Sequence, residues 1–358
     1  MRIFAATSRY MQGPGLLDQL GPQAGELGGS AVLVADDAVR ALFEGRIAKS
    51  FDAARIGLHV LPFGGEVTHA AIDELSAHAR ASKADVVIGV GGGKALDAAK
   101  GVARALRSRL VCVPTIASND GPASASIAVY DEHHRMVDVL QLRRNPDLVL
   151  VDSAIIAAAP LRFFLAGIGD AISKKFEAEA CLKANAMTLF GAPASHTGLM
   201  AAQACHTLLR THAPAAVAAL REGRLTEDVE SVIEATVLLS TISFENGGLS
   251  VAHAIARGLP FLERAAGTLH GEHVAYGLLV QLMLEDRPAA MVRELAGFYR
   301  QLGLPARLGD LLGGDPREQE FLVLAEEAMR SPSAARFTPV LDAATLGRAI
   351  RALEREAV

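Results

Sequence analysis

The sequence has little cysteine, no long apolar run and no excess of basic residues. Its 358 residues include three cysteines, Cys112, Cys181 and Cys205, and none forms a Cys-x-x-Cys pair that could begin a zinc ribbon or a redox motif. This sparse usage favours a reducing compartment, the cytoplasm. Because no run approaches about 18 apolar residues, a membrane-spanning helix is not expected.

The charge balance and the first residues exclude further classes of protein. Lys and Arg number 35 against 40 Asp and Glu, which gives a net charge of −5, and no dense basic stretch is present. A nucleic acid or an anionic membrane is therefore not an expected partner. Arg2 and Arg9 interrupt the N-terminal residues and leave no apolar segment of a secretion signal.

What the chain does have is apolar material for a large core. Hydrophobic residues make up 51% and charged residues 21%, a composition that excludes disorder. At about 100–200 residues per domain, the length predicts two domains.

The first part of the chain, residues 1–160, alternates short β-branched runs with helical stretches. The predicted strands are Ala31–Ala35, Leu58–Pro62, Asp85–Val90, Leu110–Pro114, Ala125–Tyr130 and Leu148–Asp152, and the predicted helices are Ala70–Ser82 and Ala95–Leu106. Nearly continuous apolar strands are typical of parallel strands covered on both faces. The pattern predicts an α/β doubly wound domain with a parallel sheet.

The second part, residues 161–358, has no convincing strand. Helical spacing covers Phe163–Lys183, Ala186–His212, Glu227–Ser243, Gly271–Glu285, Ala289–Leu302, Glu318–Met329 and Ala344–Glu356. A further helix is predicted to start at Ala215–Ala219, just after Pro214. We expect an all-α domain that joins the first at Pro160, with a small-molecule site in the cleft between them.

A glycine-rich segment, Gly89-Val-Gly-Gly-Gly-Lys-Ala-Leu-Asp97, follows a predicted strand and opens a predicted helix. Backbone N–H groups at such a helix start suit a pyrophosphate. The segment fits neither the Rossmann pattern, because Lys94 stands where its third glycine belongs, nor the P-loop pattern, because Ile88 and Ala95 depart from it. The alternative is that glycine serves only the tight turn.

Asp36 ends the first predicted strand and has two interpretations. An acidic side chain there can accept hydrogen bonds from an adenosine ribose, which favours NAD over NADP. Asp36 can equally cap the following helix together with Asp37.

Three ionisable residues lie at helix starts or in otherwise apolar segments, namely Asp170, His253 and His270. Buried groups of this kind need a partner, and one carboxylate with two imidazoles can hold Zn²⁺ or Fe²⁺ and leave a position open for a substrate oxygen. Their spacing matches no short metal motif. Surface or packing roles are predicted for His59, His69, His78, His133, His134, His196, His206 and His212.

Taken together, the chain resembles the glycerol dehydrogenase branch of the iron-containing alcohol dehydrogenase superfamily, which has a dehydroquinate synthase-like fold. The motifs that carry the resemblance, in order, are Gly89–Lys100, Pro114–Ser126, Gly167–Ala171, Phe176–Ala178, Phe244–Leu249, His253–Leu259 and His270–Gly277. The resemblance implies an oxidoreductase that converts a secondary alcohol to a ketone by hydride transfer to NAD.

The resemblance also implies residue roles. Asp170, His253 and His270 would hold the catalytic metal, and Asp120 would contact the substrate polyol. The NAD site would be lined by Asp36, Gly92, Gly93, Lys94, Asp97, Thr115, Ser118, Ser124, Ser126 and Tyr130. A homo-oligomer is expected as well, because the relatives assemble into oligomers.

The chain departs from this family at several positions near the predicted metal ligands. Iron-type relatives carry a fourth ligand, a histidine, where this chain has Lys174, and a protonated lysine cannot ligate, so zinc is favoured over iron. Lys174 shares a helix face with Asp170 and could pair with it or, with Arg257, bind an anionic substrate. The alternative without a functional role is that both cationic side chains extend to solvent. His273, where relatives carry lysine, is predicted to lie on a helix surface.

The same residues leave other substrate classes and functions open. A hydroxy acid, a phosphorylated polyol or a cyclitol would keep the metal and NAD, and Ser118-Asn-Asp-Gly-Pro122 departs from the usual glycerol-enzyme motif. A dehydroquinate synthase-like lyase needs more lysine and arginine than the ligand segments offer. A non-catalytic nucleotide-binding protein would be expected to lack a metal ligand or Asp120, and all of them are present.

Overall fold

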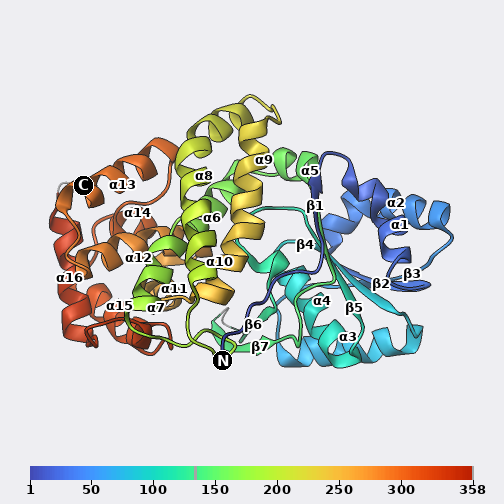
Figure 1. The fold of residues 1–358 in the computed structure, drawn as a ribbon, viewed down its shortest axis with the longest axis horizontal. Coiled ribbons are helices and arrows are strands. Elements are labelled where there is room, and N and C mark those ends of the chain that lie inside the picture. The colour runs from blue at the N-terminus through green and yellow to red at the C-terminus, as the bar shows by residue number, and fades with distance from the viewer. Residues whose placement is uncertain (133–134, 357–358) are drawn as a thin grey trace. The chain divides into compact units, whose positions relative to one another are not determined.

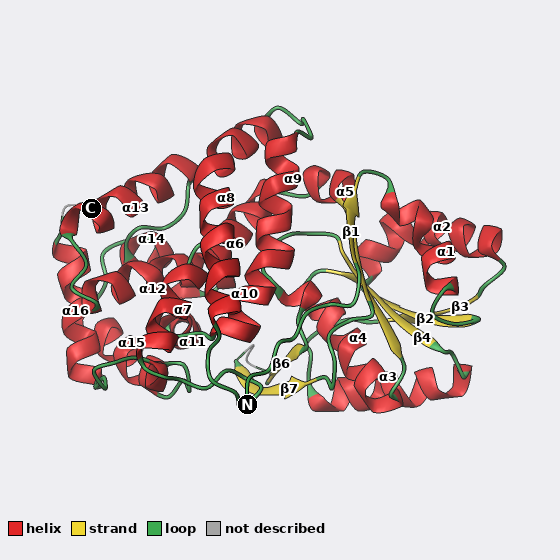
Figure 2. Ribbon diagram, in the orientation of Figure 1, coloured by secondary structure: helices red, strands yellow, loops and turns green. Residues whose placement is uncertain are grey.

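In the computed structural model, residues 1–132 and 135–356 are described, and the chain forms two compact units. One unit comprises Ala5–Pro160 with Gly223–Leu225; the other comprises Met1–Phe4, Leu161–Glu222 and the chain from Thr226 onward. Figure 2 shows that the strands belong to the first unit, which we call the sheet unit, whereas the second, the helical unit, consists of helices and loops. The histidines at 133 and 134, predicted to have surface or packing roles, lie outside the described residues.

A six-stranded parallel sheet forms the centre of the sheet unit. Its strands, in spatial order, are β1 (Tyr10–Gly13), β8 (Leu148–Asp152), β5 (Arg109–Pro114), β4 (Val86–Gly91), β2 (Ser30–Ala35) and β3 (Gly57–Pro62). Every residue of β4 and β8 is buried, as expected of inner strands covered on both faces. The parallel α/β architecture predicted from the apolar runs is confirmed.

Helices cover this sheet. They are α1 (Leu20–Gly25), α2 (Asp37–Ala54), α3 (His69–Ser82), α4 (Gly93–Leu106) and α5 (Ser153–Ala158), with short 3₁₀ turns at Leu16–Gln19 and Gly121–Ala123. Leu33, Ile88 and Leu150 of the strands pack with Ile47 and Phe51 of α2 in one buried cluster. In Figure 1, α1, α2, α3 and α4 take the blue and teal colours of the early chain, and α5 is green.

Some parts of this unit differ from the sequence prediction. The predicted strand Ala125–Tyr130 exists as β6 (Ser126–Tyr130), but it pairs antiparallel with β7 (Met136–Gln141) in a separate two-stranded sheet. Strands β1 and β7 escaped prediction because their residues are mostly half-buried and mixed in polarity. Helix α2 escaped because only four of its 18 residues are buried, which leaves a narrow apolar stripe.

The helical unit contains the remaining elements. They are α6 (Leu161–Ala171), α7 (Lys174–Lys183), α8 (His196–Arg221), α9 (Glu227–Glu234), a π-helical turn (Ala235–Leu239), α10 (Ser240–Gly247), α11 (Val251–Gly258), 3₁₀ turns at Leu259–Phe261, Glu263–Ala265 and Ala334–Arg336, α12 (His270–Leu284), α13 (Ala289–Leu302), α14 (Leu308–Leu312), α15 (Glu318–Met329) and α16 (Ala343–Arg355). This helical character agrees with the prediction for the second part of the chain.

Some helix boundaries in this unit differ from the sequence prediction. The predicted helix Phe163–Lys183 is broken between α6 and α7, where the Ser173 hydroxyl donates to the Asp170 carbonyl at 2.8 Å. The predicted helix Ala186–His212 begins only at His196. It then continues through Pro214 to Arg221, so the predicted new start at Ala215 is wrong; buried residues on either side, Ala213 and Ala216, pack this stretch in place.

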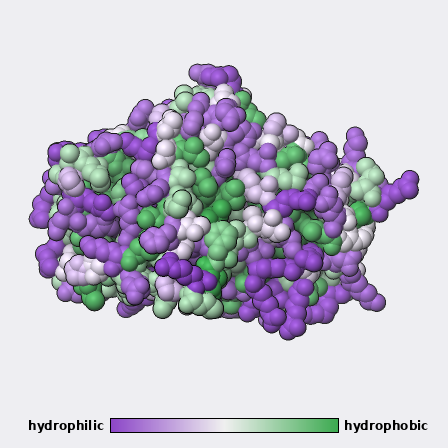
Figure 3. Space-filling model, viewed as in Figure 1, coloured by the Kyte–Doolittle hydropathy of each residue, from purple (hydrophilic) through white to green (hydrophobic). Residues whose placement is uncertain are grey.

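Among the described residues, no helix combines the length and the apolar character that crossing a membrane requires. On the face drawn in Figure 3, hydrophilic and hydrophobic residues are interspersed. The large hydrophobic residues that are most exposed, such as Leu42, Met200 and Val340, lie far apart in the sequence.

Candidate functional site

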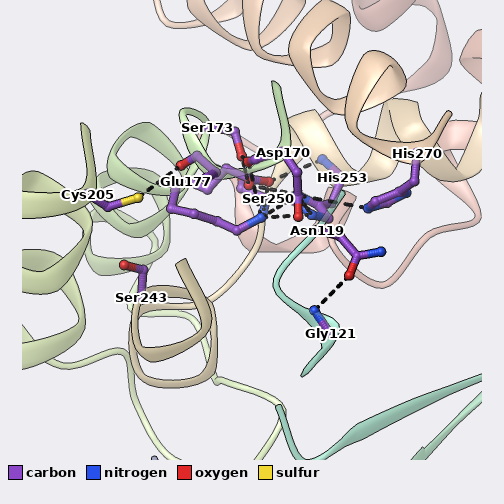
Figure 4. Close-up of polar contacts among 12 residues, drawn as sticks. Asn119, Gly121, Asp170, Ser173, Glu177, Cys205, Ser243, Ser250, His253 and His270 are labelled. Atoms are coloured by element: carbon purple, nitrogen blue, oxygen red, sulfur yellow. Dashed lines mark hydrogen bonds and ion pairs between the residues drawn. The ribbon is translucent and has the colours of Figure 1, made fainter. Parts of the chain in front are cut away.

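Three predicted ligands meet in the helical unit. Asp170 lies in the last turn of α6, His253 in α11, and His270 at the first residue of α12. One ligand atom from each lies within 4.8 Å of the other two. The Oδ1 atom of Asp170 is 3.3 Å from Nε2 of His253 and 4.0 Å from Nε2 of His270. Figure 4 shows the three side chains converging from separate helices.

Glycines beside the ligands let these helices approach closely. A Cβ added to Gly271, next to His270, would lie 1.7 Å from the Ala166 carbonyl oxygen of α6, and one added to Gly169 would lie 2.5 Å from the Gly271 carbonyl oxygen. Helices α6 and α12 therefore cross backbone to backbone at the point where each carries a predicted ligand. In the pairs Gly169-Asp170 and His270-Gly271, the glycine thus allows the close helix contact and its neighbour is a predicted ligand.

A fourth side chain, Glu177, orients His253. It is fully buried on α7, and its carboxylate accepts from Nδ1 of His253 at 2.7 Å and lies 2.9 Å from the hydroxyl oxygen of Ser173. The same carboxylate accepts from the backbone N–H groups of Ser250 at 2.7 Å and His253 at 3.1 Å. With Nδ1 engaged, Nε2 of His253 is left to face Asp170, which is the usual arrangement behind a metal-ligating histidine.

Lys174 occupies the same pocket, and its side chain is 0% exposed. Its Nζ donates to Oδ1 of Asp170 at 2.6 Å and to the Asp170 carbonyl at 3.2 Å, and lies 3.3 Å from Nε2 of His253. The interpretation that this lysine extends to solvent is therefore wrong. The pairing with Asp170, one of the alternatives that the sequence left open, is present.

The buried charges change the pKa values of these groups. Burial raises the pKa of a carboxyl, but Lys174 and the two histidines outweigh it and hold the pKa of Asp170 well below its usual range. Burial lowers the pKa of His253, but Glu177 and Asp170 outweigh it and raise that pKa to about 8. Burial also raises the pKa of Glu177, but His253 and Lys174 outweigh it and lower that pKa.

The donor set fits a divalent metal ion. One carboxylate and two imidazoles are ligands that zinc and ferrous iron both accept. The Oδ2 atom of Asp170 is buried and has no hydrogen-bond partner among the residues that the structure describes, although a buried carboxylate oxygen normally has one. An ion at this position would supply the missing contact.

The glycine loop lies at the carboxyl end of β4 in the sheet unit. Gly91 has a φ of +147°, and a Cβ there would meet the Cβ of Ala95 at 2.8 Å, so the turn itself requires this glycine. Gly92 is the N-cap of α4 and provides no side chain to cap it. The first N–H groups of α4 are therefore left for another acceptor, the property that phosphate sites at helix starts share.

Two side chains beside this loop are already paired. Nζ of Lys94 donates to a Glu66 carboxylate at 2.8 Å and is attached to a side chain that is 55% exposed. Asp36 caps α2, because its Oδ1 accepts from the N–H of Val39 at 2.8 Å. Its Oδ2 lies 3.6 Å from the position of a Cβ on Gly91, so Asp36 caps a helix and also borders the glycine loop.

Comparison with known proteins identifies the family. Residues 7–153 match the model of the iron-containing alcohol dehydrogenases. The chain is 39% identical to the glycerol dehydrogenase of Thermotoga maritima over 321 residues, 89% of this chain and 87% of that protein. The chain belongs to the iron-containing alcohol dehydrogenase family. It is a glycerol dehydrogenase-like oxidoreductase.

Two further proteins are similar to this chain over most of its length. It is 37% identical to the glycolaldehyde reductase of Halobacterium salinarum, across 91% of this chain and 89% of that protein. The crystal structure of a probable glycerol dehydrogenase from Sinorhizobium meliloti 1021 matches with a TM-score of 0.93 and 38% identity, and covers 99% of this chain and 98% of that one. The polyol and alcohol dehydrogenase group is therefore clear, whereas the relatives differ in substrate.

The other predicted cofactor residues of this family member lie around α4. Asp97 is bonded to a buried lysine, Lys100, whose Nζ lies 3.0 Å from Oδ1 of Asp97, 2.7 Å from the Gly121 carbonyl and 2.9 Å from the Ser126 carbonyl. Oδ2 of Asp97 accepts from the N–H of Ala128 at 3.1 Å. Lys100, which sequence reasoning missed, thus ties the segment from Gly121 to Ser126 onto α4.

The remaining predicted residues occupy the loops that follow β5 and the strand β6. Thr115 directly follows β5, and its N–H donates to the Gly91 carbonyl at 3.1 Å, which places it beside the glycine loop. Ser118 and Asp120 lie in the next turn, and Asn119 between them accepts from the N–H of Gly121 at 2.9 Å (Figure 4). Ser124 is buried close to Lys100, whereas Ser126 and Tyr130 begin and end β6.

His273 also differs from its prediction. It was expected on a helix surface, but it is only 5% exposed and bonds the hydroxyl of Thr268 through Nε2. Burial lowers its pKa to about 3, so it is neutral. It lies one turn from His270 along α12 and adds no charge to the site.

Proposed function

We propose that the chain is a metal- and NAD-dependent dehydrogenase that oxidises the secondary alcohol of glycerol, or of a similar small polyol, to the ketone. The observation that carries this proposal is the cluster of Asp170, His253 and His270. It occurs in a chain that is 39% identical to a glycerol dehydrogenase over nearly its full length. The fold alone would leave the reaction open.

In this proposal the helical unit holds the metal. Asp170, His253 and His270 would be its ligands, and Glu177 fixes the ring of His253 so that Nε2 faces the ion. We infer zinc rather than iron, because Lys174 stands at the position of the fourth ligand that the iron-type resemblance implies. A three-residue set with one open position is the usual arrangement of catalytic zinc.

The sheet unit would hold the NAD. The uncapped N-terminus of α4, with Gly92, Gly93 and Lys94, would bind the pyrophosphate. Asp36, at the carboxyl end of β2, would accept hydrogen bonds from the ribose through its second oxygen. The other predicted residues would line the same site, and among them Thr115 already contacts the backbone of the glycine loop. Those residues are Asp97, Thr115, Ser118, Ser124, Ser126 and Tyr130.

The chemistry is divided between the bound groups and the chain. When bound, a divalent metal would act as a Lewis acid on an alcohol or carbonyl oxygen. The nicotinamide would supply or accept the hydride of the carbon atom that bears this oxygen. The chain's own residues hold and orient these groups, and Asp120 would accept a hydrogen bond from a second hydroxyl of the polyol. The requirement for that hydroxyl would select polyols over simple alcohols.

A second candidate substrate is a short hydroxyaldehyde, reduced in the opposite direction. The 37% identity to a glycolaldehyde reductase favours it. An anionic hydroxy acid has less support, because Lys174 is fully buried and engaged with Asp170 rather than directed to a substrate. The other cation considered for this role, Arg257, is half-buried in α11.

A substrate panel tests the proposal. Purified, zinc-loaded protein would be mixed with NAD and glycerol, 1,2-propanediol or a hydroxy acid, and separately with NADH and glycolaldehyde or dihydroxyacetone, while NADH absorbance is followed. We expect turnover of the polyols and of the uncharged carbonyl compounds. Turnover restricted to the hydroxy acid would overturn the polyol proposal, and zinc-independent turnover would overturn the metal role.

A further inference from the structure

Lys174 places a positive charge inside the site that is proposed to hold a metal ion. Its Nζ is 2.6 Å from Oδ1 of Asp170 and 3.3 Å from Nε2 of His253. Those two ligand atoms are themselves 3.3 Å apart. The ammonium thus lies within hydrogen-bond distance of atoms from two of the three side chains that would hold one ion.

A divalent ion and this ammonium oppose each other in either of two arrangements. An ion held by Asp170 and His253 would bond their oxygen and nitrogen at about 2.0–2.2 Å, so it would lie within a few ångströms of the Lys174 ammonium. If the ion enters on the side of Nζ, the ammonium has to leave. If the ion enters on the other side, the two cations remain a few ångströms apart in a buried pocket, where their repulsion is little screened.

Without a metal, the same ammonium is what neutralises Asp170. The Asp170 side chain is 1% exposed, and its only ion-pair partners among the described residues are Lys174 and the two histidines. Glu177 brings a second buried carboxylate to the same pocket. A buried charge that loses its partner is strongly destabilising, so the metal-free fold depends on Lys174.

We propose that the ammonium group of Lys174 takes the place of the metal ion in the metal-free protein. It stabilises the metal-free protein by neutralising Asp170, and it weakens the binding of a divalent cation to Asp170, His253 and His270. The inference rests on the metal site of the proposed function and adds to it the residue that sets its metal affinity. Metal occupancy of this enzyme would then follow the supply of the ion rather than being permanent.

Zinc affinity of the whole protein provides the direct test. Metal-free wild type, Lys174→Met and Lys175→Met would be titrated with Zn²⁺ against a chromophoric chelator. We expect Lys174→Met to bind Zn²⁺ about tenfold or more tightly than wild type, since a nearby like charge is removed. Lys175, the adjacent lysine, is half-buried with its Nζ 5.1 Å from the ring centre of Phe176, and its variant should match wild type. Equal or weaker binding by Lys174→Met would overturn the proposal.

Thermal unfolding supplies an independent readout. Without metal, Lys174→Met should unfold at a lower temperature than wild type. Addition of Zn²⁺ should raise its unfolding temperature by more than that of wild type, because a ligand that binds more tightly stabilises the folded state more. Lys174→Gln, whose amide can still donate to Asp170 without carrying charge, serves if the methionine variant does not fold. Folding of either variant only with Zn²⁺ supports the proposal. Failure of both variants to fold even with Zn²⁺ would overturn it.

Asp170→Asn separates this inference from the proposed function. If wild type and Lys174→Met bind Zn²⁺ no more tightly than Asp170→Asn does, the metal site itself is refuted and the proposed function fails with it. If wild type binds Zn²⁺ through Asp170 but Lys174→Met binds no tighter, only the role of Lys174 fails.

Discussion

The two candidate sites of this chain are built from different materials. The metal cluster consists of side chains from α6, α11 and α12, is surrounded by buried charges, and depends on helices that touch backbone to backbone. The glycine loop consists mainly of backbone between β4 and α4, and its charged neighbour Lys94 is largely exposed. Single substitutions should therefore have large, far-reaching effects at the first site and small, local effects at the second.

The largest effect is expected from Asp170→Asn. Removing the charge from the only carboxylate among the three ligands should lower kcat/KM with glycerol about a thousandfold or more, since a metal supplies several kcal/mol of stabilisation. NADH affinity, measured by fluorescence, should remain near the wild-type value, because the glycine loop belongs to the other unit. A variant that keeps its bound zinc and its activity would break the distinction between the two sites.

Gly271→Ala comes next. Its Cβ would lie 1.7 Å from the Ala166 carbonyl oxygen, so α6 and α12 must separate, at a cost of about 1–3 kcal/mol or more of unfolding free energy. Zinc affinity should fall with it. The matched control is Gly297→Ala on α13, where the nearest atom, from Arg300, is 4.0 Å away, and where alanine should stabilise by about 0.5–1 kcal/mol. Equal stability of the two variants in chemical denaturation would refute the packing account.

Glu177→Gln tests the support behind His253. The amide keeps the size of the side chain but weakens its bond to Nδ1, and loss of such a partner typically lowers metal affinity about 10–100-fold. Isothermal titration with Zn²⁺ measures this, with Glu179→Gln on the same helix as the control, since Glu179 pairs with Arg287 instead. Unchanged affinity in Glu177→Gln would show that His253 is held by packing alone.

The pH dependence of the metal-free protein should come from the metal cluster. The pKa of His253 is raised from 6.5 to about 8, so its stabilising contribution is complete below pH 6.5 and is lost as the pH rises through 8. The difference corresponds to roughly 2 kcal/mol. Urea denaturation of wild type should show this loss, whereas His253→Gln should not. Stability that stays constant or rises over this interval in wild type would contradict the assignment.

The smallest effect is expected at the glycine loop. Lys94→Gln removes one exposed charge and should weaken NADH binding by about three- to tenfold, because an exposed ion pair contributes on the order of 1 kcal/mol. Its zinc affinity should not change, and Lys49→Gln on the exposed surface of α2 should change neither quantity. A large loss of zinc from Lys94→Gln would show that the two sites are not independent.

This contrast also explains how much the sequence could reveal. The glycine loop was predictable because strand, glycines and helix follow one another within the stretch from Val86 to Leu106, and the parallel strands were predictable from their apolar runs. Strand β6 was recognised, but its partner was not, because a hairpin with half-buried residues gives a weak alternation.

The candidate metal site was harder to predict from local sequence patterns. Its three candidate ligands were selected as ionisable groups in apolar segments and through the family resemblance, but no spacing rule joins residues so far apart. Glu177 lies in the segment Phe176–Ala178, which carries part of the family resemblance, and no role was predicted for it, although a carboxylate between apolar residues was a usable signal. The burial of Lys174 could not be inferred, because the spacing to Asp170 gives a shared helix face and says nothing of whether that face turns inward.

The most direct test of the account is a metal titration of activity. Wild type and Asp170→Asn would be freed of metal with a chelator, and zinc would be returned stepwise while NAD-linked oxidation of glycerol is followed. We predict that wild-type activity disappears on removal, returns in proportion to added zinc, and saturates at one ion per chain, whereas Asp170→Asn recovers almost none. Full activity of the metal-free wild type would contradict the central claim that Asp170, His253 and His270 form a catalytic metal site.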